Sequence, residues 1–491
     1  MVEFTFTKEA MMESVAIIGG GPSGIATARY LKSQGFAPVI YESHSEVGGQ
    51  WACNNPNSGV WPQMRTNTAR MVTRFSDLDY KDDIALFPKN TEIQQYLKDY
   101  LSAFELDSVL QTQTRLTSLS RVEGVWHLEL DHDGEVQHKT FDKVVIATGA
   151  YNTPNIPKIE GLAEFSGDCG VIHAFNYDDP ERYRGKKVLV AGGNISSLEI
   201  ASDLAMLGTE SVTTTMRRQR YVMPKLITGT PTECYAFTRS AALWQEQATP
   251  EEWAAETREF ILKYSGNPAW YGAPEPDEDV LAAGTTGSQH FLHLIAENRI
   301  TCKPWIEKVE GRVVHFTDGS QADFDGIIFG TGYTLNLPFL SDELRQQLDV
   351  TNKHIALANH TFHPDVPNLA FMGLWGQIGP YLPVLEQQAR YLAYSWSGLM
   401  PLDEDILRAS CNDSMNQKGK DLYQHMQTIK FARLNGSDPE GKVPEDVASL
   451  IYHHPVTALT FKLVGPDAIP DAYEQLQQES MRFGLKPTSL R

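Results

Sequence analysis

The feature that most constrains this chain is a short glycine-rich turn between a buried strand and a helix. The apolar residues 14–19 lead into the segment GGGPSG, and a helical pattern follows until Gly35. A second apolar run ends at Glu42, roughly 20 residues after the turn, as the dinucleotide fingerprint requires. This order of strand, turn, helix and strand predicts a parallel βαβ unit that binds a dinucleotide.

Each glycine of the turn has a physical role in holding a pyrophosphate. The first allows the tight turn, the second lets the backbone approach the anion, and the third lets the helix pack closely on the strand. The amides at the helix N-terminus then face the anion. An acid after the second strand accepts hydrogen bonds from ribose hydroxyls and disfavours a 2′-phosphate, which favours FAD or NAD over NADP. The residues expected to bind are Gly19, Gly21, Pro22, Ser23, Gly24 and Glu42.

The same pattern occurs a second time in a weaker form. Residues 186–191 are a buried strand, followed by GGNISS and a helix, so that Asn194 and Ser197 replace two glycines. Asn tolerates a left-handed backbone and Ser is small, so nucleotide binding remains open. The next strand ends in two arginines, whose guanidinium groups suit a 2′-phosphate and favour NADPH. An ordinary strand–helix junction with a solvated basic pair is the alternative. The candidate residues are Gly192, Asn194, Ser196, Ser197, Thr215, Arg217 and Arg218.

Composition excludes several other classes. The 491 residues include 42 basic and 62 acidic side chains, a net charge of −20, which disfavours nucleic acids and anionic membrane surfaces. The five cysteines never form a CxxC pair, which excludes a dithiol redox centre and a cysteine-rich metal site. Because no apolar run reaches the ~18 residues of a membrane span, we expect a cytoplasmic protein without membrane contact. A homodimer is the default oligomer.

Further motifs resemble those of the flavin-containing monooxygenases, a family of class B flavoprotein monooxygenases. GGQW at 48–51, MRTN at 64–67 and FSGDCGVIHAFNY at 165–177 are similar to family segments. FGTGYTLNLPFL at 329–340 and EQQARY at 386–391 extend the resemblance, which covers about residues 15–394. One departure is the loop between Gly167 and His173, which holds five residues where the family has three.

The resemblance implies an α/β fold with two Rossmann-like domains, the smaller inserted in the larger. FAD is then expected on residues 1–165 and 331–491, and NADPH on residues 170–325. Asn67 becomes the catalytic candidate beside the flavin, and His173 a linker residue that positions the two domains. The further FAD contacts that the resemblance implies are Gly49, Gln50, Trp51, Arg65, Thr66, Leu116, Thr148, Gly149 and Gln388.

The implied reaction uses NADPH and dioxygen. NADPH reduces the flavin, dioxygen forms a flavin hydroperoxide, and a small-molecule soft nucleophile, an amine nitrogen or a sulfide sulfur, takes up one oxygen atom. A Baeyer–Villiger oxidation of a ketone is the nearest alternative, but its fingerprint ends in Trp where this chain has Tyr177. A flavoprotein that binds nucleotides without monooxygenase turnover is a second alternative, because the second glycine motif is altered.

Overall fold

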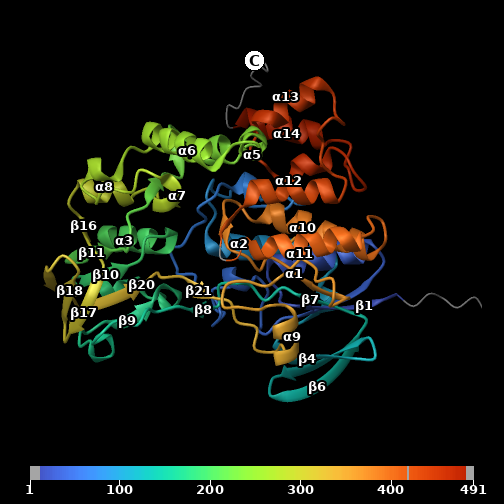
Figure 1. Cartoon of the computed structure of the whole chain (residues 1–491), viewed down its shortest axis with the longest axis horizontal. Coiled ribbons are helices and arrows are strands. Elements are labelled where there is room, and N and C mark those ends of the chain that lie inside the picture. Colours follow the sequence, from blue (N-terminus) through green and yellow to red (C-terminus); the bar gives the residue numbers. More distant parts are fainter. Residues whose placement is uncertain (1–11, 417, 419, 483–491) are drawn as a thin grey trace, which may run out of the picture.

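The computed structural model describes residues 12–416, 418 and 420–482 and contains two parallel five-stranded sheets, one in each lobe of the molecule (Figure 1). The first sheet has the order β22-β7-β1-β2-β3, and neighbouring strands are parallel throughout. Its strands are β1 (Ser14–Ile18), β2 (Ala37–Tyr41), β3 (Leu110–Gln111), β7 (Lys143–Ile146) and β22 (Leu369–Phe371). The predicted βαβ unit is therefore present, with α1 (Pro22–Ser33) between β1 and β2.

The second sheet has the order β16-β11-β10-β20-β9 and is also parallel. Its strands are β9 (Gly170–His173), β10 (Lys187–Ala191), β11 (Ser211–Thr215), β16 (Ile300–Lys303) and β20 (Gly326–Phe329). In the sequence all five lie between β7 and β22 of the first sheet, and β20 extends the second sheet beyond residue 325. The predicted α/β class with two Rossmann-like units is confirmed, whereas the domain boundaries stay a prediction.

Two antiparallel meanders flank the sheets. The first consists of β4 (Thr114–Val122), β5 (Val125–His132) and β6 (Glu135–Phe141), and the second of β17 (Ile306–Glu310), β18 (Val313–Phe316) and β19 (Gln321–Asp323). The two chain passages between the lobes pair as β8 (Thr153–Pro154) and β21 (Tyr333–Thr334). The other short strands are β12 (Tyr221–Met223), β13 (Leu226–Ile227), β14 (Thr230–Pro231), β15 (Thr285–Gly287), β23 (Gln377–Ile378) and β24 (Leu422–Tyr423).

Helices cover the sheets and join the lobes. Helix α5 (Arg239–Gln245), from the chain between the strands of the second sheet, packs against α12 (Gln424–Leu434) and α13 (Glu445–His453) (Figure 1). The remaining helices are α2 (Asn90–Ala103), α3 (Ile195–Leu207), α4 (Glu233–Ala236), α6 (Pro250–Tyr264), α7 (Val280–Ala283), α8 (Phe291–Ala296), α9 (Asp342–Gln347), α10 (Leu382–Trp396), α11 (Glu404–Asn416) and α14 (Ala472–Arg482). Within the residues described, no helix is both long and apolar enough to cross a membrane.

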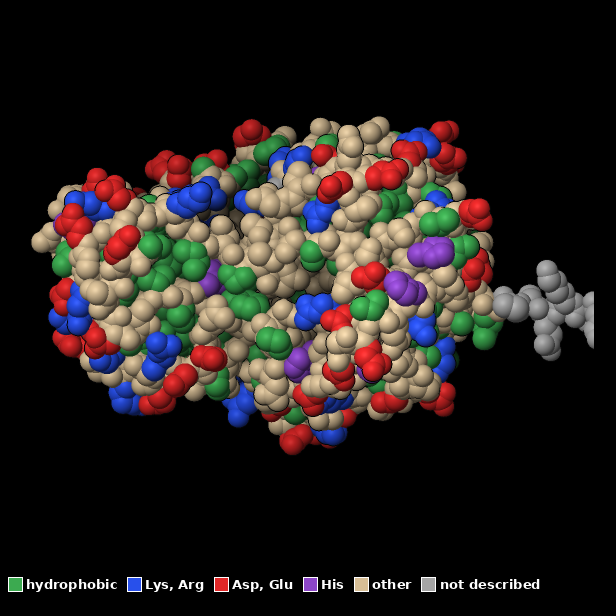
Figure 2. Space-filling view, turned by 90° about the horizontal axis from the view of Figure 1, so that it is seen from below, with side chains coloured by type: hydrophobic (Ala, Val, Ile, Leu, Met, Phe, Trp, Pro, Cys, Tyr) green, Lys and Arg blue, Asp and Glu red, His purple; other side chains and the backbone are tan. Residues whose placement is uncertain are grey.

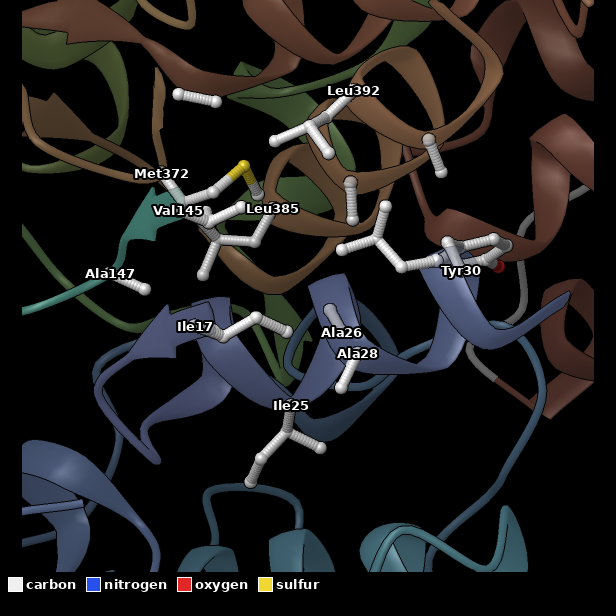
Figure 3. Packing of buried hydrophobic residues seen from close by; sticks show 14 of the residues in the cluster. Ile17, Ile25, Ala26, Ala28, Tyr30, Val145, Ala147, Met372, Leu385 and Leu392 are labelled. Atoms are coloured by element: carbon white, nitrogen blue, oxygen red, sulfur yellow. The ribbon is translucent and has the colours of Figure 1, made fainter. Parts of the chain in front are cut away.

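The largest core lies between the first sheet, α1 and α10. Ile17 and Val145, partners on neighbouring strands, and Leu385 of α10 are almost wholly buried and belong to this cluster (Figure 3). Helix α10 is buried on nearly every side. Its buried residues, polar and apolar alike, are therefore not confined to one face.

A buried charge cluster ties this core together. Arg390 of α10 is fully buried, and its guanidinium contacts Glu386 at 2.8 Å and Asp467 at 3.2 Å. Glu386 also accepts hydrogen bonds from Ser76 N at 2.7 Å and from the Tyr30 hydroxyl at 2.9 Å. The cluster thereby joins α1, α10, the loop before α2 and the C-terminal region.

We expect Arg390→Leu to lower the free energy of unfolding by about 3–5 kcal/mol, because it leaves buried carboxylates without their partner. Urea unfolding of the flavin-loaded protein measures this loss. The matched control is Arg408→Leu, which removes solvent-exposed ion pairs to Glu404 and Asp365 and should cost below about 1 kcal/mol. Equal losses in the two variants would contradict the assignment.

Candidate flavin and nucleotide sites

The first glycine turn brings α1 into direct contact with β1. Gly19 has a φ of +117°, and its N–H donates to the Tyr41 carbonyl at 2.8 Å. A Cβ on Gly24 would overlap the Gly19 carbonyl, and one on Gly19 would overlap the Ala147 carbonyl. Both positions therefore require glycine. Pro22 occupies the first turn of α1, where a missing N–H costs nothing.

The GGQW segment packs on this turn. The Gly48 N–H donates to the Gly20 carbonyl at 3.0 Å, and a Cβ on Gly21 would lie 3.4 Å from the Cα of Gly49. Trp51 is buried, and its indole N–H donates to the Tyr381 hydroxyl at the start of α10. The fold thus brings the glycine turn and the GGQW segment together. Nothing in the sequence pointed to Tyr381.

Glu42 stands at the tip of β2 and is only 5% exposed. Its Oε2 accepts a hydrogen bond from Gly20 N at 2.7 Å, and its Oε1 accepts one from His44 N at 2.8 Å. A carboxylate has about four acceptor sites, so the remaining lone pairs can accept ribose hydroxyls. Glu42 therefore fixes the glycine turn and keeps capacity for a nucleotide.

Asn67 Oδ1 and Thr148 Oγ1 are among the buried polar atoms that have no hydrogen-bond partner in the described chain. A buried polar group without a partner costs about 1–3 kcal/mol. Gly149, which follows Thr148, has a φ of +76° and open space where a Cβ would stand. Together with the glycine turn, these atoms fit a bound flavin nucleotide.

The loop that carries Asn67, residues 61–73, is held by contacts to residues 87–88 and by a contact within the loop. Thr66 N–H donates to the Pro88 carbonyl at 2.9 Å, and the Thr66 hydroxyl donates to the Thr68 carbonyl at 2.8 Å. Arg65 is exposed and donates to the Phe87 carbonyl at 3.2 Å. These side chains hold the loop, which leaves Asn67 as the residue with an unused buried acceptor.

Three other predicted flavin residues have different surroundings. Gln50 is exposed beside Trp51, and Leu116 is buried in the core between the first sheet and its meander. The Gln388 amide is fully used by the protein, since it bonds to Gly373 N, the His360 and Phe371 carbonyls and the Thr361 hydroxyl at 3.1 Å each. Through its Oε1, Gln388 also holds the Gly373 turn, where an added Cβ would lie 2.8 Å from the Ser23 hydroxyl of the glycine motif.

The second turn keeps the close approach with different residues. Gly192 has a φ of +140° and its N–H donates to the Thr215 carbonyl at 2.8 Å. The Ser197 hydroxyl donates to the Gly330 carbonyl at 3.2 Å, and a Cβ on Gly330 would overlap that hydroxyl. The chain accommodates a serine because the facing residue of the Gly-Thr-Gly segment is itself glycine.

The expectation that Asn194 replaces a glycine by adopting a left-handed backbone is wrong. Its backbone is extended, with φ −110° and ψ 173°, and its side chain caps α3 by accepting from Ile195 N at 3.0 Å. This cap occupies the first amide of α3, so an anion would face the amides that follow it in the first turn. Ser196 lies half-buried in the first turn of this helix.

Three arginines gather beyond the end of β11. Arg217 is exposed, with its guanidinium 5.0 Å above the ring of Trp305, while Arg218 donates to the Ala282 carbonyl at 2.6 Å. Arg220, which sequence reasoning missed, donates to the Thr285 carbonyl at 3.2 Å, and burial lowers its pKa. The Thr215 hydroxyl donates a hydrogen bond to the Pro304 carbonyl, so this side chain has a partner within the protein.

His173 lies at the junction of the lobes. Its Nδ1 accepts a hydrogen bond from Phe175 N at 3.1 Å, and its ring lies 5.1 Å from that of Tyr333. Burial lowers the pKa of the imidazole, which favours a neutral linker residue. The long loop before it forms a turn in which Cys169 N donates to the Asp325 carbonyl at 2.7 Å.

The chain belongs to the flavin-binding monooxygenase-like family, whose model matches residues 12–482. A rat relative, dimethylaniline monooxygenase [N-oxide-forming] 2, is 26% identical over 98% of this chain and 94% of its own. This assignment confirms the predicted family, and FAD and NADPH as predicted cofactors agree with it.

Solved structures share the fold. S-allyl-L-cysteine S-oxygenase from Allium sativum aligns with a TM-score of 0.61 and 21% identity over 97% of this chain and 90% of its own. A cyclohexanone monooxygenase aligns with a TM-score of 0.64 and 18% identity over 88% and 98% of the two chains.

We expect Gly24→Ala to lose bound flavin, because the added methyl group overlaps the Gly19 carbonyl and forces the turn apart. The ratio of flavin absorbance to protein absorbance after gel filtration measures this loss. Gly287→Ala is the matched control, since its Cβ would meet nothing closer than the Met223 carbonyl at 3.8 Å. Full flavin content in Gly24→Ala would contradict the steric argument.

Proposed function

We propose that this protein is an FAD- and NADPH-dependent monooxygenase that oxygenates a soft nucleophile, an amine nitrogen or a sulfide sulfur. FAD binds the larger domain, residues 1–165 and 331–491, and NADPH binds the inserted domain, residues 170–325. The observation that carries the proposal is the buried, unpaired acceptor of Asn67 in a chain that also holds a complete glycine turn. The N-oxide-forming and S-oxygenating relatives support the substrate class.

The bound cofactors supply electrons from NADPH and an activated oxygen atom from dioxygen. Gly19, Gly21 and Gly24 give the pyrophosphate its seat, and Glu42 receives the ribose hydroxyls. Asn67 Oδ1 would offer a hydrogen-bond acceptor to a bound flavin. The rings of Trp51 and Tyr381, joined by their hydrogen bond, would help to exclude water from the site.

The described residues offer no metal cluster of His, Cys, Asp and Glu side chains. A soft nucleophile needs no such group, since it attacks an already activated oxygen. A ketone substrate is the alternative, and the cyclohexanone monooxygenase fold is compatible with it. We rank it second because Tyr177, packed 5.9 Å from Trp61, stands where the Baeyer–Villiger fingerprint has Trp.

The partners are a small-molecule substrate and dioxygen rather than a nucleic acid. On the face shown in Figure 2, acidic and basic side chains are interspersed over both lobes. With a net charge of −20, such a surface repels a phosphate backbone.

The decisive experiment supplies the FAD-loaded protein with NADPH, air and one of three probes: methyl phenyl sulfide, N,N-dimethylaniline or cyclohexanone. NADPH consumption and product mass are followed together. A sulfoxide or an N-oxide supports the proposal, and a lactone favours the ketone alternative. If the flavin absorbance spectrum does not change when NADPH is added, whichever probe is present, the flavoprotein without turnover would be favoured.

We expect Asn67→Ala to lower oxygenated product per NADPH consumed by about tenfold or more, because a buried polar contact to the cofactor is lost. NADPH oxidation continues, and hydrogen peroxide accounts for the difference. Asn352→Ala, which changes an exposed loop asparagine, is the control and should keep the wild-type ratio. An unchanged ratio in Asn67→Ala would remove Asn67 from the site.

We expect Arg217→Ala to raise KM for NADPH by about 10–100-fold with little effect on NADH, because a charge-assisted bond to the 2′-phosphate contributes roughly 1.5–3 kcal/mol. Steady-state NADPH and NADH oxidation measure the two constants. Arg184→Ala, an exposed arginine that pairs with Glu181, is the control. An equal effect on both nucleotides would mean that Arg217 does not read the phosphate.

A further inference from the structure

The loop of residues 61–73 is held by a carboxylate from the other lobe. Ala69 is completely buried, and its N–H donates to Glu233 Oε1 at 2.9 Å. Glu233 begins α4, in the chain between β11 and β16 of the second sheet, and is 2% exposed. A buried backbone N–H requires a partner, and here the inserted region provides it.

A second contact holds the same loop at its start. The Trp61 indole N–H donates to Asp203 Oδ2 of α3 at 2.9 Å. The contacts at Trp61 and Ala69 therefore bracket Asn67 on both sides. Around Ala69 the two lobes also share an apolar cluster in which Met71 and Val72 pack with Cys234 of α4.

Few charges surround Glu233. Lys225 faces it, but the Lys225 ammonium is paired with Glu199 at 2.8 Å. Within this loop Arg70 directs its guanidinium to the Ile84 carbonyl, and on α4 the neighbouring titratable group is Cys234. Glu233 Oε2 has no hydrogen-bond partner in the described chain. Outside its own residue, the carboxylate is thus committed to the Ala69 amide.

Burial sets the ionisation of this group. It raises the pKa of the Glu233 carboxyl to about 7, although its own N–H, that of Ala69 and Lys225 act in the opposite direction. The carboxylate form accepts a charge-assisted hydrogen bond, roughly twice as strong as that of the neutral acid. The contact to Ala69 is therefore stronger above this pKa and weaker below it.

We propose that Glu233 is a positioning residue: from the nucleotide-binding domain it holds the Ala69 amide and thereby fixes the position of Asn67 at the flavin. The two cofactor sites are coupled through this bond, because any displacement of the inserted domain pulls on the Asn67 loop. The part played by Asn67 rests on the proposed function, whereas the hold on the loop does not.

Hydrogen exchange of the FAD-loaded protein tests the hold directly. In Glu233→Ala we expect peptides covering residues 66–73 to exchange at least tenfold faster than in wild type. Glu233→Gln keeps an acceptor oxygen for Ala69 and should retain most of the protection. The matched control is Asp325→Asn, a buried second-lobe carboxylate that accepts Lys187 N at 2.8 Å and does not touch the loop. Unchanged exchange in Glu233→Ala, or equal exchange in the control, overturns the proposal.

Coupling of NADPH consumption to product tests the consequence. In wild type the share of NADPH lost as hydrogen peroxide should rise several-fold as the pH falls through about 7. In Glu233→Gln this share should stay level between pH 6 and 8, because the amide does not titrate. A purely structural role for Glu233 would leave the two pH profiles parallel, which overturns the positioning role.

The failure of this inference is distinguishable from failure of the proposed function. The exchange measurement needs no substrate, so it decides the hold on the loop even if wild type forms no oxygenated product. If Glu233→Ala does not fold, exchange of residues 66–73 in wild type and Glu233→Gln at pH 6 and 8 decides instead. Wild type should be better protected than Glu233→Gln at pH 8 and should approach it at pH 6, where both offer Ala69 a neutral acceptor. Identical behaviour at the two pH values would refute the hold.

Discussion

The close approach of a helix to a strand at a glycine turn governs both halves of this molecule. At Gly19 and Gly24 the helix backbone lies against the strand carbonyl, so the first amides of α1 converge on the place where a pyrophosphate binds. The second lobe reaches the same approach with Ser197 against Gly330. In both lobes the packing of the first helix on its sheet depends on this close contact being permitted sterically.

A network of buried charges then fixes the packing of helices in the first lobe. Arg390 and Glu386 are fully buried and pair with the partly exposed Asp467, and this network determines how α10 sits on α1. Such pairs contribute little net stability. They are costly to break, because removing one partner leaves an uncompensated charge in the protein interior. Because α10 also presents Tyr381 to Trp51, the network and the flavin site share one helix.

The loop of residues 61–73 is a place where the two lobes meet. The loop follows the GGQW segment in the sequence, yet two residues that hold it by hydrogen bonds, Asp203 and Glu233, come from the second lobe. Asn67 therefore depends on both domains for its position. This arrangement gives a physical reason why a nucleotide bound on one domain can influence oxygen chemistry on the other.

The sequence by itself determined the two βαβ units, their order and the family, because glycine, strand and helix patterns are local and sterically strict. From resemblance and spacing it predicts Asn67 and Glu42 as flavin residues, and these stay predictions. The reason offered for Asn194 was wrong, because its backbone is extended and its side chain caps a helix, and the partners of the Gln388 amide inside the protein were not foreseen. It gave no sign of Tyr381, Arg220 or Glu233. Those residues matter through partners distant in the chain, such as Ala69 for Glu233, and only tertiary packing decides which buried polar group finds which partner.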